Sequence, residues 1–176
     1  SLSSEDKRIK LVFRKQNGNI SACSNSAVDL ATGEWVTLLD HDDTITPNAL
    51  FEIVDALQEQ KQADVVYSDQ DKINMQGAYY QPFFKPNWSP VFFKGVMYVG
   101  HLLAVRRIIG QKAGWFNPEF DKIQDYEFML RVSELTDKII HVPKVLYHWR
   151  ESKTSIAGNS DAKGTIEALQ ERAVND

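Results

Sequence analysis

Short apolar runs alternate with helix-like segments over the first 67 residues, and this order limits the folds that the chain can adopt. The apolar runs are residues 9–13 (IKLVF), 34–39 (EWVTLL) and 63–67 (ADVVY). Between them, residues 21–33 and 46–57 carry apolar side chains at helical spacing. Strands that alternate with helices build a parallel sheet covered by helices. The sequence therefore predicts an α/β fold with a mostly parallel central sheet flanked by helices.

Capping residues mark the ends of the two predicted helices. Ser21 is placed to cap the first helix, and Gly33 stands where a left-handed C-terminal cap is expected. Thr46 and Pro47 are residue types that begin a helix. The apolar stripe predicted for the second helix consists of Leu50, Ile53, Val54 and Leu57.

Regular elements are also predicted in the second half of the chain. Residues 68–95 are rich in proline and aromatic side chains, which indicates a packed loop over a site, with a polar turn at residues 74–77. Strands are predicted at residues 97–105, 139–142 and 145–149, and helices at residues 106–112, 124–136 and 162–174. The 176 residues have the length of one domain, in which residues 1–8 and 152–176 are expected to be flexible or peripheral.

Charge and cysteine content narrow the class of protein. The 24 acidic and 20 basic residues give a net charge of −4, which argues against binding to a nucleic-acid backbone. The single cysteine, Cys23, excludes an intrachain disulfide framework and any multi-cysteine metal site. A single cysteine is consistent with a reducing compartment, so we expect a cytoplasmic domain. No run approaches the roughly 20 apolar residues of a membrane span. The chain does not begin with Met, so we interpret it as a piece of a longer protein.

The strongest local signal for chemistry is the acidic segment that directly follows the second apolar run. Asp40, His41, Asp42 and Asp43 stand at the carboxyl end of this predicted strand, where open α/β sheets bind their ligands. Three carboxylates within four residues repel one another unless a cation lies among them, and their oxygens suit Mg²⁺ or Mn²⁺. A solvated acidic turn that helps to start the next helix is the alternative, and this segment alone does not separate the two.

The surrounding sequence resembles the family 2 glycosyltransferases. The stretch NGNISACSNSAVDLATGEWVTLLDHDD carries the family's Asn and Ala pattern, a Gly-Glu-aromatic helix end, an apolar strand and an Asp-x-Asp motif. The resemblance continues through YSDQDKIN, FKPNWSP, YVGHLLAVRR, IQDYEFMLRV and VLYHWR, over roughly residues 9–156. It implies a GT-A-like fold and an inverting sugar transfer in bacterial cell-envelope polysaccharide synthesis. The donor implied is a nucleotide sugar, and the acceptor is a saccharide or a lipid-linked molecule.

The resemblance also assigns a metal site. Asp42 matches the direct ligand of the Mn²⁺ or Mg²⁺ that holds the donor's diphosphate, and Asp40 lies toward the ribose or the outer shell of the metal. Asp43 is a second-rank candidate, and its alternative role is that of a capping acid before Thr46. His148 matches a position that completes the metal site or contacts the diphosphate in some members, and simple packing is its alternative.

The same resemblance implies a general base and contacts to the donor. Asp125 matches the family's acid that takes the proton from the acceptor hydroxyl, while a first-turn acid favoured by the helix dipole is the alternative. Glu127 cannot share its helix face and is expected to be structural or an acceptor contact. His101 resembles a residue near the donor sugar and acceptor, or is a half-buried strand histidine. Asn17 and Asn25 resemble positions that fix the loop and helix beside the nucleotide, with a purely structural role favoured for Asn25.

Further charged residues are weaker candidates. Arg150 and Lys153 could balance the charge of the leaving group, or they are solvated surface cations. Asp69 and Asp71 end the third predicted strand and so point toward the same rim, where Lys72 could neutralise them.

One departure from the family affects what this chain is expected to do. Family members normally begin with a strand, helix, strand, helix unit ahead of the segment corresponding to Ile9, and this unit carries an acid that contacts the nucleotide base. Its lack here implies weak or no donor binding by the chain alone. A sheet without its first strands exposes an edge, which favours a homodimer. Peripheral association of the parent protein with the inner face of the membrane is also expected.

Two other function classes stay open on the sequence. The acidic segment would also suit a metal-dependent nucleotidyl or phosphoryl transferase, although the chain has no Gly-rich phosphate loop of the G-x-x-x-x-G-K-S/T type. The aromatic stretch of residues 79–93 would suit a noncatalytic carbohydrate-binding fragment.

Overall fold

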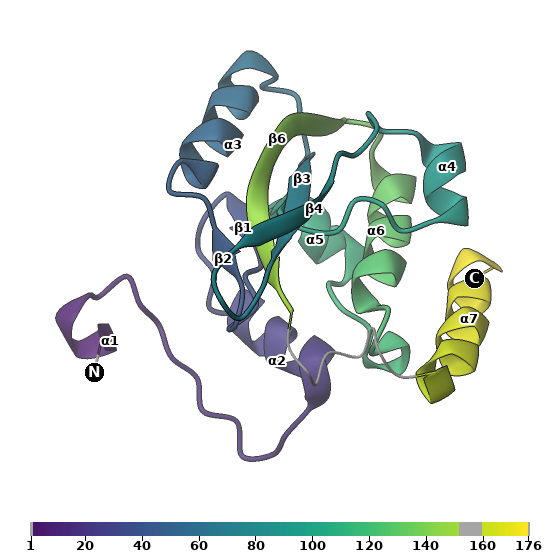
Figure 1. Cartoon of the computed structure of the whole chain (residues 1–176). Coiled ribbons are helices and arrows are strands. Elements are labelled where there is room, and N and C mark those ends of the chain that lie inside the picture. The colour runs from purple at the N-terminus through teal and green to yellow at the C-terminus, as the bar shows by residue number, and fades with distance from the viewer. Residues whose placement is uncertain (1, 152–159, 176) are drawn as a thin grey trace.

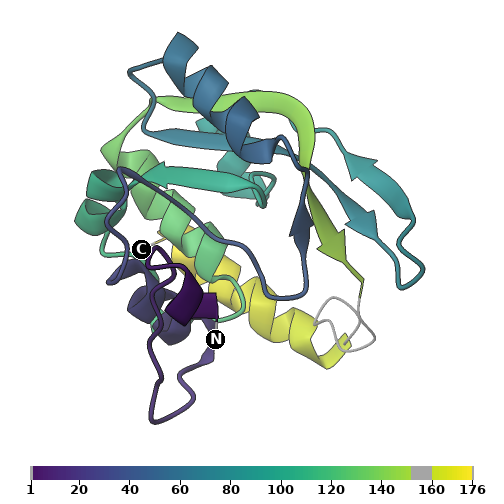
Figure 2. The ribbon, with the colours of Figure 1, turned by 90° about the vertical axis from the view of Figure 1, so that its left-hand side faces the viewer.

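Residues 65–68 are fully buried, and they form the first half of the central strand, β3 (Val65–Ile73). The computed structural model describes residues 2–151 and 160–175. Along β3, Val65 and Tyr67 belong to the apolar core shared with α6 (Gln124–Leu135), whereas Val66 belongs to the core shared with α3 (Ala49–Glu59). Because successive strand side chains point to opposite faces, β3 joins two helical layers. Figure 2 shows α3 on one face of the sheet and α6 on the other.

The sheet is mixed rather than mostly parallel. Its strand order is β1-β5-β3-β6-β2, with β4 paired to the outer half of β3. The further strands are β1 (Trp35–Thr37), β2 (Thr44–Ile45), β4 (Tyr79–Phe83), β5 (Leu103–Arg106) and β6 (Ile139–Arg150). Only the pairing of β3 with β6 is parallel among these described strands. The prediction of an α/β sheet flanked by helices is confirmed (Figure 1), and the predicted parallel pairing is wrong at most positions.

The position of β5 explains this difference. Because β5 runs antiparallel to both β1 and β3, β1 and β3 have the same direction, as their helical connection predicts. However, β5 lies between them and removes the direct parallel contact. A tight turn at residues 74–78 joins β3 to β4, and such a turn can only join antiparallel strands. The predicted polar turn is thus confirmed, whereas the predicted loop after residue 68 is partly a hairpin.

The first apolar run does not form the predicted strand. Residues 9–13 are extended coil between α1 (Leu2–Glu5) and α2 (Asn19–Val28), and Phe13 is 90% exposed. A strand needs a neighbour for its backbone N–H and C=O groups, and none of the described strands runs beside this segment. Side-chain bonds from Lys10 and Arg14 to carbonyls of residues 30 and 22 hold it near α2 instead.

The predicted caps of the first two helices are also corrected. Ser21 lies inside α2, and its backbone N–H donates to the carboxylate of Asp121 at 3.0 Å, so the cap comes from 100 residues away. The helix ends at Val28, well before Gly33. α3 begins at Ala49 rather than Pro47, and of its predicted stripe only Ile53 is buried.

The remaining elements complete the layer around α6. They are α4 (Pro90–Gly95), α5 (Arg107–Ala113), the 3-10 helix η1 (Pro118–Phe120) and α7 (Ser160–Asn175). The helices predicted at 106–112, 124–136 and 162–174 are confirmed, and the two strands predicted on either side of Pro143 are one strand, β6. Ile166, Leu169 and Ala173 of α7 pack against the core. Among the described helices, none has the length and apolar character needed to cross a membrane.

Candidate active site

A cleft of about 920 Å³ lies at the carboxyl ends of β1, β3 and β6. These three strands run in the same direction, so the loops and residues at their ends meet at one edge of the sheet. Several predicted site residues line this cleft together, namely Asp40, Asp42, Asp71, Lys72, His101, Asp125 and Arg150. The fold therefore brings the acidic segment close to the start of α6, although Asp40 and Asp125 are 85 positions apart in the sequence.

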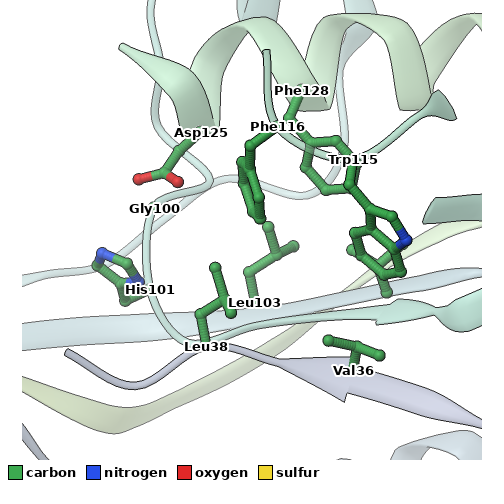
Figure 3. Close-up of a pocket in the computed structure, with 10 residues that line it drawn as sticks. Val36, Leu38, Gly100, His101, Leu103, Trp115, Phe116, Asp125 and Phe128 are labelled. Carbon is green, nitrogen blue, oxygen red and sulfur yellow. The ribbon is translucent and has the colours of Figure 1, made fainter. Parts of the chain in front are cut away.

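Asp125 lies in the first turn of α6 at the border between this cleft and an apolar pocket. Figure 3 shows its carboxylate facing the side of the pocket that holds His101, while Leu38 and Phe116 form the apolar part of the wall. Burial raises the pKa of Asp125, the nearby His101 lowers this pKa, and the nearby Asp40 raises it. A raised pKa in a cleft is typical of groups that transfer protons.

His101 connects Asp125 to the acidic segment. Its ring stacks on the ring of Tyr147, with the centroids 4.6 Å apart, and its Nε2 lies 3.9 Å from Oδ2 of Asp40. The side chain is about one fifth exposed. His101 is thus a fixed wall of the cleft, held close to Tyr147 on β6 and to Asp40 of the acidic segment.

The three acids of the segment have different surroundings. The side chains of Asp40 and Asp42 are 57% and 41% exposed and line the cleft. Asp43 is buried, and its carboxylate accepts hydrogen bonds from the hydroxyl of Tyr147 and, at 2.7 Å, from the backbone N–H of Arg150. Asp43 therefore fastens the acidic segment to β6, and its predicted alternative role as a helix cap is wrong.

Arg150 is held beside the acidic segment by two bonds. Its backbone N–H donates to Asp43, and its Nε donates to the carbonyl oxygen of Asp42 at 2.6 Å. Because the guanidinium also lines the cleft, its positive charge faces the space next to Asp42. A diphosphate in this space would meet both a cation and the two exposed carboxylates.

The third predicted metal ligand is not brought to the same place. Nδ1 of His148 lies 2.5 Å from Oδ1 of Asp71, and its ring packs on Tyr79. His148 and Trp149 are consecutive on β6, so they point to opposite faces, and it is Trp149 that lines the cleft. Within residues 2–151 and 160–175, no group of three or more His, Cys, Asp and Glu side chains is arranged to hold a metal ion.

The donor set that does line the cleft still fits a hard cation. Mg²⁺ and similar ions are commonly held by one or two carboxylates together with waters and substrate phosphates, without a full cage of protein ligands. Asp40 and Asp42 offer such oxygens at an open face. A site of this kind is completed by the phosphates of the substrate.

The other predicted residues have structural contacts. Both polar atoms of the Asn25 side chain bond to the backbone of Phe116, at 2.8 and 3.0 Å, so Asn25 holds α2 against the wall of the apolar pocket. The side chain of Asn17 accepts the N–H of Asn19 in a turn before α2. Glu127 pairs with Arg131 one turn further along α6. None of these three side chains is among the described residues that line the cleft.

Asp69 is buried and bonds to the N–H of Lys85 and to the ring of His141, so it has no access to the cleft. Lys153 lies outside the described residues. The predicted site residues included neither Trp149, which lines the cleft, nor the buried Lys85. The period of two along β6 from Tyr147 could have indicated Trp149, whereas nothing local to Lys85 signals its burial.

The sequence of this chain matches a known protein family and several curated proteins. The model of the family described as glycosyl transferase family 2 matches residues 1–114. An uncharacterized protein, y4gI, of Sinorhizobium fredii is 35% identical over 99% of this chain and 19% of its own length. The O-antigen biosynthesis protein RfbC of Myxococcus xanthus is 33% identical over 97% of this chain and 13% of its own length. The chain thus spans a fifth or less of these two relatives.

Solved structures show the same fold. The crystal structure of S. aureus TarS 1–349 in complex with UDP-GlcNAc superposes on 92% of this chain and 47% of its own length, with a TM-score of 0.70 and 16% identity. At this level of identity the likeness concerns the fold alone.

Proposed function

Because the chain belongs to glycosyl transferase family 2, we propose that it is the part of a nucleotide-sugar-dependent transferase where the sugar passes to its acceptor. One observation carries the proposal: Asp125, the exposed acids Asp40 and Asp42, and Arg150 line a single cleft. The name of RfbC supports a bacterial surface polysaccharide as the product, and UDP-GlcNAc in the TarS structure supports a nucleotide-sugar donor. The acceptor is then a saccharide or a lipid-linked chain.

In the proposed step, Asp125 acts as the general base. Its carboxylate takes the proton of an acceptor hydroxyl while that oxygen attacks the anomeric carbon of the donor sugar. The bond from this carbon to the diphosphate oxygen breaks, and the electron pair leaves with the diphosphate. A single displacement of this kind inverts the anomeric configuration. The Arg150 guanidinium, held by the carbonyl oxygen of Asp42, offsets the charge on the leaving group.

The exposed carboxylates would hold the cation that the family resemblance implies. We assign Asp42 as the direct ligand and Asp40 as the second oxygen donor. Mg²⁺ or Mn²⁺ bound there would neutralise the charge that develops on the diphosphate. His148, bonded to Asp71, is left out of this assignment.

Replacing Asp42 by Asn is expected to lower the affinity for UDP in the presence of Mn²⁺ by at least about tenfold, because a carboxylate ligand is lost. Calorimetric titration of the complete gene product measures this, and EDTA should have the same effect on the wild type. Asp55→Asn, an exposed acid on α3, is the control. UDP affinity that is unchanged both by EDTA and by the Asp42 variant would contradict the metal assignment.

Replacing His101 by Asn is expected to move the acid limb of the rate profile to higher pH. The base must be ionised, so transfer is lost as pH falls through the pKa of Asp125, and His101 lowers that pKa. Without the imidazole the pKa of Asp125 rises, so the rate of sugar transfer begins to fall at a higher pH. The measurement is kcat/KM against pH for both proteins. A limb that stays in place or moves to lower pH would speak against Asp125 as the base.

A further inference from the structure

Lys85 is a buried lysine that the proposed transfer step does not use. It is only 5% exposed, and its Nζ donates to the carbonyl oxygens of Val99, at 2.6 Å, and His101, at 2.5 Å. Burial lowers the pKa of Lys85 to about 7. Burying an amine costs free energy unless its hydrogens are bonded. The two bonds to carbonyl oxygens therefore indicate that Lys85 has a specific role at this position.

The backbone of Lys85 is anchored separately from its amine. Its N–H donates at 2.9 Å to Oδ1 of Asp69, a buried carboxylate that also contacts Nε2 of His141 at 2.8 Å. Asp69 lies on β3, in the centre of the sheet. The Lys85 side chain therefore starts from a fixed point and reaches toward the segment before β5.

Side chains take over most of the pairing in that segment, where one backbone bond remains, from the N–H of Ser68 to the carbonyl oxygen of Leu102 at 3.0 Å. The pairing of β5 with β3 begins at Leu103, opposite Tyr67. Before it, Oε1 of Gln70 accepts the N–H of His101 at 3.1 Å, and Oγ of Ser68 accepts the N–H of Leu102 at 3.3 Å. A strand was predicted over residues 97–105, and in the structure the strand is shorter, because β5 begins only at Leu103.

The turn at Gly100 fits closely against these side chains. Gly100 has a φ of +45°, which favours glycine, and a Cβ there would lie 2.7 Å from Oε1 of Gln70 and 3.7 Å from Nζ of Lys85. The two carbonyls that Lys85 binds flank this residue. Removing the amine would leave both carbonyls without the donor that holds the turn.

We propose that Lys85 is a positioning residue: by binding the carbonyls of Val99 and His101 it fixes the turn that sets the His101 ring against Tyr147 and beside Asp40. The effect of Lys85 on sugar transfer rests on the proposed function. The effect of Lys85 on the orientation of the His101 ring does not, because that orientation can be measured without any substrate.

The test compares Lys85→Met with Lys94→Met in the complete gene product. Met keeps the length of the side chain and removes the amine, and Lys94, on α4, is exposed. We expect nuclear Overhauser effects between the rings of His101 and Tyr147 in the wild type and in Lys94→Met, and their loss in Lys85→Met. Retention of these ring contacts in a folded Lys85→Met protein would overturn the proposal.

If the Lys85→Met protein does not fold, a second measurement on the wild type tests the proposal. In the wild type, the Nζ hydrogens of Lys85 should exchange slowly with solvent and show contacts to the α-hydrogens of residues 99–101. Fast, solvent-like exchange at Lys85 would overturn the assignment without any variant.

Transfer kinetics separate this proposal from the proposed function. Misplacing a group by about 1 Å can cost on the order of 10²-fold in rate, so Lys85→Met should lower kcat by about that factor with a smaller change in KM. If the ring contacts are lost but transfer is unaffected, the turn is fixed by Lys85 and the catalytic use of His101 is wrong. If Asp125 variants keep full activity, the proposed function fails while the ring measurement still stands.

Discussion

Asp125→Asn is expected to lower the rate of sugar transfer by the complete gene product by about 10²–10⁴-fold. The amide has the shape of the carboxylate but cannot take the proton of the acceptor hydroxyl. Donor affinity should change little, because the exposed acids Asp40 and Asp42 and the cation Arg150 are untouched. Transfer rates with a nucleotide-sugar donor, alongside UDP affinity, measure both effects. Asp55→Asn should leave both values at the wild-type level.

The same variant is expected to be at least as stable as the wild type at neutral pH. Because burial raises the pKa of Asp125, the folded state holds its proton to a higher pH than the unfolded chain does. The stability from this group is therefore present at low pH and is lost as pH rises through the folded-state pKa. An amide avoids the buried charge altogether. Loss of transfer with an undiminished melting temperature would identify a chemical role, whereas parallel loss of both would indicate that Asp125 is structural.

Asp43→Ala is expected to destabilise the fold by about 2–4 kcal/mol, because it leaves the buried Tyr147 hydroxyl and the part-buried Arg150 N–H without their acceptor. For a chain of this size that corresponds to a fall in melting temperature of about 5–15 °C. UDP affinity should fall as well, because Arg150 and the acidic segment lose their common anchor. Urea denaturation and calorimetry measure the two effects.

Asp42→Ala is the matched control for stability, since it removes the neighbouring acid at an exposed position. It should cost no more than about 0.5 kcal/mol, as is usual for surface substitutions. A cycle with Tyr147→Phe then measures the bond between Tyr147 and Asp43 directly. Equal stability of the Asp42 and Asp43 variants would show that Asp43 does not fasten the segment to β6.

Local patterns were sufficient for several parts of this protein. Helical spacing located α5, α6 and α7, and the alternation of strands and helices predicted the common direction of β1 and β3 correctly. The acidic segment was correctly placed at the carboxyl end of a strand, where the cleft lies. These features depend on residues close together in the chain, and sequence periodicity records them directly.

Other features depend on which distant segment lies alongside, and no local pattern records that. β5 lies between β1 and β3 although residues 74–102 separate it from the end of β3. The apolar residues 9–13 form no strand because none of the described strands lies beside them. The sequence by itself determined that acids stand at the end of a strand and that Asp125 begins a helix. Only the tertiary structure decided that Asp43 is buried against Tyr147 while Asp42 faces the cleft, and that His148 points away while Trp149 points in. The physical reason is that burial and pairing energies belong to contacts between segments, and folding alone brings those segments together.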